Sequence, residues 1–528
     1  MNSPNVFISE INNKVYVPKD INEIAAYVGY FEKGPINQPV LITDLLQFKS
    51  IFGRGIDLYH NDWYQVYNYL QYSSAIWVCR SAGTHQWNAS NNGRDTILDK
   101  EDFDNSYENF ETKNGFRVFA KQPGEYGNLY TITCITLSEW SDNVILYGTT
   151  RAKDVFSFFE DNNFGICLFR KNVLLESYYL DETTIHDINK ENSFLYWKID
   201  YEDITPFYNS TAHKLSEGSV NLSSQDNLLE SHELFKSKEN YYFDIIIGNE
   251  FDNSMAISVA DYRRDCIAFI GLPTKYIEWL NILMGDKSSE ILYAVEGIPI
   301  AIKEFKHKKR YSERELKNLN DYIASMQQSQ FCHFTMNVKE QYDGFTQKNK
   351  LVNIAGDTAG LKAQAANKTP WSASAGLERG QIKNFTSIYI NFDKNTHNSY
   401  YKRGLNFIEN GVLMTQKTYL SKETAFNRVN VRALFNYIEK SIEYYIKRFV
   451  FEENSYNKRR LISSEIKRIL EEVRLNRGIQ SAKSYVTTHP DNENNILITI
   501  EIKPIYVAEY IVLKLANVGT NQMTEIIS

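Results

Sequence analysis

The adjacent residues Cys332 and His333 are of two types that bind zinc and other transition metals in proteins. The segment around them has the pattern of a strand, however, and neighbouring strand residues point to opposite faces. The nine histidines and five cysteines of the chain form no further group with the spacing of metal ligands. A buried or surface pair without a metal is therefore the favoured interpretation, and we expect no metal site.

Motifs for nucleotide binding and nucleophilic catalysis are incomplete in this sequence. Gly53 and Gly55 in GRGID lack the third glycine of a dinucleotide fingerprint, and they follow a helical pattern instead of a strand. Ser372 and Ser374 lie in TPWSASAG, which is not the G-x-S-x-G turn that exposes a serine nucleophile. The sequence therefore predicts no catalytic residue and no nucleotide cofactor.

Two carboxylates in HPDNENN, Asp491 and Glu493, resemble a fragment of a calcium-binding loop only loosely. Asn, Asp and Pro are also the residues that build solvated turns. A turn between a helix and the terminal strands is the favoured interpretation, so we expect no cofactor of any kind.

A basic helix predicted near residues 458–477 reverses the charge of the chain as a whole. The chain has 58 Lys+Arg and 65 Asp+Glu, a formal net charge of −7, whereas this helix has seven basic and three acidic residues, or +4. A basic helix face is most often just solvated, and the alternative is that it docks on an acidic partner surface. The residues predicted to face such a partner are Lys458, Arg459, Arg460, Lys467, Arg468 and Arg474.

Both ends of the chain contain alternating apolar residues, which is the pattern of strands. Strands outside a main domain either fold back on their own chain or add to the sheet of a neighbouring molecule. The sequence leaves both possibilities open. The residues predicted to form inter-subunit strand arms are Val6, Ile8, Val15, Val17, Ile496, Ile498, Ile500, Ile502, Tyr510, Ile511 and Val512.

Length and composition indicate a folded protein of about three or four domains. Its 528 residues are 43% hydrophobic and 23% charged, which excludes a largely disordered chain. The acidic balance argues against a dedicated nucleic-acid binder, and no stretch approaches the length of an apolar membrane span. Five scattered cysteines without a CxxC spacing favour a reducing compartment. We therefore expect an intracellular, soluble protein with no nucleic-acid partner and no membrane insertion.

The pattern of elements predicts a multidomain fold that combines α+β and α/β parts. Short strands separated by polar turns dominate 91–240, whereas strands alternate with helices after residue 241, and two long amphipathic helices precede the terminal strands. The predicted divisions are an N-terminal strand arm over 1–21, the first part of a middle region over 22–90, a β-rich insertion over 91–240, an α/β domain over 241–384 and a C-terminal domain over 385–528.

Five segments carry a resemblance to a known family, in the order in which that family has them. They are VGYFEKGPINQPVLITDLLQFKSIFG (28–53), AKQPGEYGNLYTITC (120–134), DTAGLKAQAANKTPWSASAG (357–376), YKRGLNFIENGVLMTQKTYLS with FNRVNVRALFNYIEKSI (401–442), and IEIKPIYVAEYIVLKL (500–515). Together they resemble the contractile tail sheath proteins of bacteriophages and related contractile injection systems. Residues 135–240 show no pattern that aligns with the family.

The resemblance implies a structural subunit that stacks as hexameric rings around a tail tube and contracts to drive the tube through a target envelope. It implies an inner α+β domain with terminal strand arms, a subtilisin-like α/β middle domain and a β-rich inserted outer domain. The implied partners are further copies of the chain, the tail tube protein, and the baseplate and tail terminator proteins. The implied location is the virion tail, assembled in the host cytoplasm.

Two other classes of function follow from parts of the chain. Subtilisin-like folds are usually enzymes, so a hydrolase built on 241–384 is an alternative, although no nucleophile motif supports it. The Tyr- and Asn-rich segment 91–240 is also compatible with a module that binds glycans or a host protein. Labelling by a fluorophosphonate probe would favour the first alternative, and glycan binding by the segment would favour the second.

Overall fold

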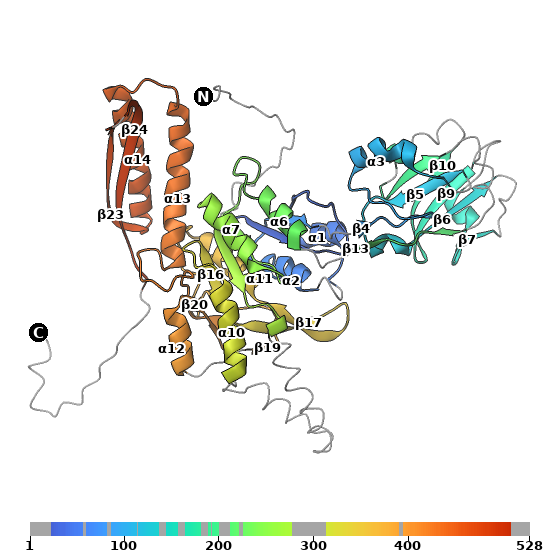
Figure 1. Cartoon of the computed structure of the whole chain (residues 1–528), viewed down its shortest axis with the longest axis horizontal. Helices are drawn as coiled ribbons and strands as arrows, with labels where there is room; N and C mark the ends of the chain where they lie inside the picture. Colours follow the sequence, from blue (N-terminus) through green and yellow to red (C-terminus); the bar gives the residue numbers. More distant parts are fainter. Residues whose placement is uncertain are drawn as a thin grey trace, which may run out of the picture. The chain divides into compact units, whose positions relative to one another are not determined.

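The computed structural model describes residues 23–55, 60–81, 86–112, 115–136, 144–156, 164–180, 188–191, 193–199, 212–220, 225–276, 313–389, 394–490 and 492–507. The chain divides into two compact units, with the boundary after Ala433 (Figure 1). The first unit contains an α/β core and a strand-rich segment. The second contains helices and one long β-hairpin.

A seven-stranded sheet forms the centre of the first unit. Short apolar runs such as III and IAFIG form its middle strands because a parallel strand is buried on both faces. Six strands are parallel, and β2 is an antiparallel edge strand. Their order is β2 (Val40–Ile42), β3 (Ile76–Arg80), β1 (Ala25–Gly29), β14 (Ile245–Ile247), β15 (Ile267–Gly271), β16 (Cys332–Thr335) and β20 (Leu405–Asn406).

Helices cover both faces of this sheet, which makes a three-layer α/β core. Alternate residues of each strand enter different cores: Ala26 and Val28 pack on one side, and Ala25 and Tyr27 on the other. The helices that contribute to the first core include α6 (Gln225–Leu234), α7 (Asn253–Arg263) and α10 (Glu313–Ser325). Those that contribute to the second core include α1 (Leu45–Phe52), α2 (His60–Tyr69) and α11 (Ala355–Ala366).

Smaller elements complete the α/β core. A three-stranded antiparallel sheet has β17 in the middle, and a short hairpin follows α12. Their bounds are β17 (Val338–Asp343), β18 (Lys348–Asn353), β19 (Ser387–Tyr389), α12 (Lys394–Lys402), β21 (Ile408–Glu409) and β22 (Val412–Leu413).

The strand-rich segment lies in sequence between β3 and β14, which both pair with β1. It has its own apolar core, built around Trp197, Ile132 and Leu168. Its four-stranded sheet has the order β10-β9-β6-β12. Its elements are β4 (Gln86–Trp87), α3 (Lys100–Ser106), β5 (Phe116–Ala120), β6 (Tyr130–Thr136), β7 (Ile145–Tyr147), β8 (Thr150–Arg151), α4 (Ala152–Val155), β9 (Phe164–Arg170), β10 (Val173–Leu180), α5 (Ile188–Glu191), β11 (Leu195–Ile199), β12 (His213–Lys214) and β13 (Ser219–Val220).

The described residues of the second unit contain long helices and a hairpin. Helix α13 (Val429–Ile446) begins in the first unit, where Val429 is buried, and continues into the second. The remaining elements are α14 (Tyr456–Leu475), β23 (Ile479–His489) and β24 (Asn492–Pro504). The mixed α+β and α/β multidomain fold predicted from the sequence is confirmed in this coarse sense.

The division between the units differs from the predicted start of the C-terminal domain at residue 385. Residues 385–433 belong to the first unit because β19 pairs with β17, and because β20 pairs with β16 as the last strand of the central sheet. Both strands are only two or three residues long, so their hydrophobic pattern is too short to be assigned to a sheet from sequence.

Candidate interaction surface

Helix α14 and the β23–β24 hairpin form the body of the second unit (Figure 1). The helix begins at Ser455, whose hydroxyl accepts a hydrogen bond from the backbone N–H of Lys458 at 3.4 Å. Its apolar residues recur at helical spacing and form one stripe, so the helix buries a single face. The buried residues of that face are Ile462, Ile466, Ile469, Leu470 and Val473.

The hairpin has two unlike faces. The isoleucines of β24 lie opposite Ala482, Ser484, Val486 and Thr488 of β23, and this face is half-buried along both strands. The intervening residues are exposed and include Tyr485 and Leu497, which are 49% and 38% accessible. The predicted alternation of Ile496, Ile498, Ile500 and Ile502 on one face is confirmed.

The isoleucines of β24 are predicted to form an inter-subunit strand arm. Within this chain, β24 pairs along its length with β23, and the contact of these residues with another subunit stays a prediction. Pro490 lies in a turn after β23, so the turn predicted in HPDNENN is present, but it lies between two strands and not between a helix and a strand. A strand with a neighbour so close in sequence pairs locally because closing a short loop costs little entropy.

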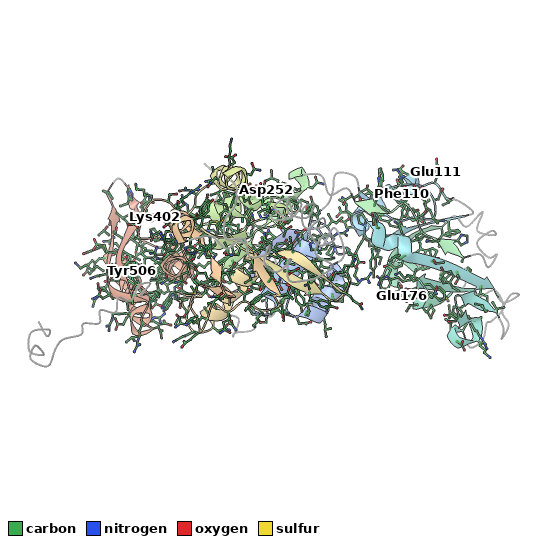
Figure 2. All side chains as sticks on the ribbon, turned by 90° about the horizontal axis from the view of Figure 1, so that it is seen from below. Phe110, Glu111, Glu176, Asp252, Lys402 and Tyr506 are labelled. Atoms are coloured by element: carbon green, nitrogen blue, oxygen red, sulfur yellow. The ribbon has the colours of Figure 1, made fainter. Side chains whose placement is uncertain are left out.

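Both outer edges of this hairpin lack a strand partner within 434–490 and 492–507. An unpaired edge exposes backbone N–H and C=O groups that can bind another strand. A lone hairpin is also marginally stable in water, so it depends on what packs beside it. The chain continues past β24 through Ile505 and Tyr506, and the side chain of Tyr506 is 60% exposed (Figure 2).

Most of the predicted basic residues on α14 already have partners in the same unit. Arg468 bonds Glu465 at 2.6 Å and approaches Glu472 at 3.5 Å, and the hydrogen bond to Arg468 holds the pKa of Glu465 below its usual value. Arg474 pairs with Glu471 at 2.5 Å. These pairs are exposed, so they neutralise charge more than they stabilise the helix.

Basic residues at the N-terminal end of α14 also contact residues that are close in sequence. Lys458 pairs with Glu452 at 2.7 Å, and the guanidinium of Arg459 donates to the backbone carbonyl of Asn454 at 2.8 Å. Arg459 therefore fastens the loop before the helix. The structure thus brings the six predicted residues onto one helix, but it leaves less free positive charge than their number suggested.

A groove opens between α14 and β23, with a volume of about 430 Å³. Arg460, Lys467 and Arg474 are spaced by seven residues, so they follow one flank of the helix. Lys467 and Arg474 line the groove, and Lys483 faces them from β23. The complete lining is Lys467, Leu470, Glu471, Arg474, Ile479, Ala482, Lys483, Ser484 and Tyr485.

Strand β23 was missed in the sequence. In its sequence IQSAKSYVTTH, half-buried positions alternate with exposed ones, and the half-buried residues are mostly small or polar. Of the residues of β23, only Ile479, Tyr485 and Val486 are large and apolar. The only available signal was the strong strand pattern of β24, which needs a partner strand nearby. The other predicted arm residues, Val6, Ile8, Val15, Val17, Tyr510, Ile511 and Val512, lie outside the described residues.

The carboxyl edge of the central sheet, where α/β enzymes usually bind substrates, contains a buried polar cluster. Asp62 accepts hydrogen bonds from the Tyr27 hydroxyl at 2.5 Å and from the Tyr30 backbone N–H at 2.9 Å. Glu250 accepts from the hydroxyl of Thr274 at 2.6 Å. Burial raises the pKa of Asp62 to about 6 and that of Glu250 to about 8. These hydrogen bonds join Asp62 of α2 to residues 27–30, and Glu250 to Thr274.

Cys332 and His333 are both buried in β16. The His333 ring lies 3.1 Å from the Lys417 carbonyl and 3.1 Å from the Thr335 hydroxyl, and burial lowers its pKa to about 4. The imidazole is therefore neutral at physiological pH and serves packing. Across the described ranges, no group of three or more His, Cys, Asp or Glu side chains is arranged to hold a metal ion.

Residues 421–516, which include α13, α14 and the hairpin, match the family model of the phage tail sheath C-terminal domain. The chain is 23% identical over 478 residues to the tail sheath protein of Vibrio phage KVP40, covering 81% of this chain and 69% of that protein. It is 25% identical over 451 residues to the tail sheath protein of Enterobacteria phage T4, covering 76% of this chain and 65% of that protein. The chain therefore spans about two thirds of the length of these relatives.

The crystal structure of a sheath tail protein from Desulfitobacterium hafniense has the same fold. The TM-score is 0.55 at 12% identity, and the match covers 96% of this chain and 100% of that one. The relatives are structural proteins and not enzymes, in agreement with the lack of a catalytic motif. In the part of the chain that the structure describes, none of the helices has the length and apolar character needed to cross a membrane.

Proposed function

This chain belongs to the tail sheath protein family, and on that premise we propose that it is a structural subunit of a contractile tail sheath. Its copies stack as hexameric rings around a tail tube. The sheath contracts and drives the tube through a target cell envelope. Tail sheath proteins of phages are virion components, and we assign the same location to this chain.

The observation that carries the proposal is the open-edged hairpin of the second unit, within the segment that matches the sheath C-terminal domain. A contracting polymer must keep its subunits linked while other contacts between them are exchanged. Main-chain hydrogen bonds between a neighbour's arm and the edge of β23 or β24 suit this requirement because they leave the rest of each subunit free to rotate. The arms proposed are residues 1–21 and 505–528.

The remaining assignments follow the same premise. The α/β core is proposed to be the subtilisin-like middle domain, and the strand-rich segment the outer domain. The further partners proposed are the tail tube, baseplate and tail terminator proteins. Because Lys458, Arg468 and Arg474 are paired with glutamates, an electrostatic contact of α14 with the tube would depend most on Arg460 and Lys467. Arg460→Glu is then expected to weaken assembly on tubes more at low salt than at high salt.

Electron microscopy of the purified full-length chain tests the proposal. We expect long tubes or helical polymers, and we expect that deletion of residues 1–20 gives subunits that remain folded but do not polymerise. Circular dichroism of the deleted chain verifies its folding. Polymers of normal length from chains that lack both 1–20 and 505–528 would contradict the proposed arms.

A further inference from the structure

Two turns meet, one in the α/β core and one in the strand-rich segment. The first follows β1 and contains Gly34, and the second follows β5 and contains Gln122 and Gly124. Both lie in segments that resemble the sheath family, 28–53 and 120–134. The two glycines have φ angles of 116° and 122°, which residues with a Cβ rarely adopt. These glycines of the family-like segments are therefore required by the turns.

Arg80, the last residue of β3, holds the two turns together. Arg80 is 2% exposed, and its guanidinium donates to the carbonyl of Gly34 at 2.9 Å and to the carbonyl of Pro123 at 2.9 Å. The backbone N–H of Gly34 donates to the side-chain carbonyl of Gln122 at 2.7 Å. A buried guanidinium that loses its acceptors is costly, so these hydrogen bonds favour contact between the turns. Arg80 and the two turns thus form one joint.

Two cations, one from each part of the chain, lie against one tyrosine ring at this joint. Lys33 belongs to the core and Arg170 ends β9, and their charged groups lie 5.1 Å and 4.1 Å from the centre of the Tyr126 ring. Neither cation has a carboxylate within ion-pair distance in the part of the chain that the structure describes. Partial burial and the charge of Arg170 lower the pKa of the Lys33 ammonium, and the opposing effect of Glu32 is smaller. The ring therefore offsets a repulsion across the joint.

The joint matters because the two parts share no apolar cluster among the described residues. The described clusters of the strand-rich segment contain residues between 89 and 215 only, and those of the α/β core contain none of these residues. Parts of a chain that share no apolar core move relative to each other unless other contacts hold them. The hydrogen bonds of Arg80 and Gln122 are such contacts.

We propose that this joint is a salt-sensitive hinge between the α/β core and the strand-rich segment. Arg80 keeps the joint closed, and the Tyr126 ring keeps Lys33 and Arg170 from forcing it open. Attraction and repulsion oppose each other at one place, so a change at either shifts the balance between a closed and an open joint. The hinge is a property of the single subunit, and it goes beyond the proposed function, which does not require it.

The distance between two spin labels on the full-length chain tests the inference. The native cysteines are buried, so a nitroxide reagent labels Leu46→Cys of the core and Glu111→Cys of the strand-rich segment, both at exposed positions (Figure 2 for Glu111). Dilution with unlabelled chain removes pairs between molecules. We expect one narrow distance distribution for the wild type and a width about twofold larger with Arg80→Met, because several orientations are then populated. Arg94→Met, which breaks an exposed pair with Glu217 inside the strand-rich segment, is the matched control and should leave the width unchanged.

Salt separates the role of Tyr126 from ordinary packing. Tyr126→Leu keeps an apolar side chain but removes the ring that both cations contact. The screening length is about 30 Å at 0.01 M salt and about 3 Å at 1 M salt. We expect the Tyr126→Leu distribution to be broad at low salt and to narrow toward the wild-type width at high salt. The Arg80→Met distribution should stay broad at both, and Tyr126→Leu with Lys33→Met should be narrow at both.

Two results would overturn the inference. A wild-type width for Arg80→Met would contradict the closing role of the guanidinium, and a Tyr126→Leu width that does not change with salt would contradict the salt-sensitive hinge. Circular dichroism of each labelled variant verifies its folding. If Arg80→Met does not fold, Gln122→Ala replaces it, because it removes only the hydrogen bond to Gly34, and it should broaden the distribution by a smaller amount. Polymerisation is not a readout here, so failure of the hinge leaves the proposed function unaffected.

Discussion

The strands of the central sheet in the first unit and those of the hairpin in the second unit differ in how fully they are paired and buried. Each middle strand of the sheet has a strand on both sides and helices on both faces, so strands such as β1 and β15 are wholly buried. The hairpin has two strands, a half-buried face and open edges. The first arrangement closes the fold within one chain, and the second leaves hydrogen-bonding groups for other chains. Under the proposed function, stability and assembly therefore depend on different parts of the molecule.

One ion pair from each unit illustrates a similar contrast between buried and exposed charge. Lys339 and Asp357 of the first unit form an ion pair of 2.9 Å, and neither side chain is exposed. The hydroxyl of Tyr72 donates to the same carboxylate at 3.1 Å. In the second unit, the pair between Arg468 and Glu465 lies at the surface. Buried pairs fix a fold because either partner alone is costly, whereas exposed pairs are readily exchanged.

The largest expected effect comes from breaking the buried pair. Asp357→Ala leaves the Lys339 ammonium without its counter-charge, and we expect it to lower the free energy of unfolding by about 3–5 kcal/mol. All seven tryptophans precede residue 372, so urea unfolding followed by tryptophan fluorescence reports on the first unit. The double change Lys339→Met with Asp357→Leu should cost less than the single change. A single change without effect would contradict the contrast between buried and exposed pairs.

A smaller effect is expected from pH. The pKa values of Asp62 and Glu250 are raised to about 6 and about 8, so the folded state binds protons that the unfolded state releases. The stabilisation that the protonated Asp62 and Glu250 give to the folded state is complete below pH 4. It is lost as pH rises through about 6 for Asp62 and about 8 for Glu250. We expect the difference in unfolding free energy between Glu250→Gln and the wild type to change by on the order of 2 kcal/mol from pH 4.5 to 8.5. This change in free energy is smaller than the full pKa shift of Glu250 implies, because the side chain of Glu250 keeps some solvent access.

Tryptophan-monitored unfolding across pH measures this difference. The variant should be relatively more stable at pH 8.5 than at pH 4.5. The exposed change Glu111→Gln is the control and should give a difference that does not vary with pH (Figure 2). A difference for Glu250→Gln that is also constant across the range would show that this carboxyl is not held protonated.

The smallest effect is expected at the surface of α14. Arg468→Gln removes the contacts with Glu465 and Glu472, but both partners remain solvated. We expect no measurable change in the hydrogen-exchange rates of α14 peptides, because exposed pairs contribute little to stability. Faster exchange throughout the helix would indicate that its surface charges stabilise the second unit.

The sequence was informative wherever the hydrophobic pattern was strong and local. The sequence predicts strands that alternate with helices after residue 241 and two long amphipathic helices before the terminal strands, and β14, β15, α13 and α14 confirm this pattern. Strand β23 was missed because its inward residues are small or polar. The buried pair of Glu23 with Lys362 joins residues 339 positions apart, and no local pattern indicates such a contact. The groove also depends on how the helix packs on the hairpin, which its residues alone do not specify.

The central claim is that the edge of β23 is open in the subunit and paired in the polymer. Hydrogen exchange measured on the full-length chain, before and after polymerisation, tests it most directly. We predict that peptides covering residues 480–488 gain strong protection on polymerisation, whereas peptides of β14 and β15 are equally protected in both states. Unchanged exchange of residues 480–488 in well-formed polymers would contradict the claim.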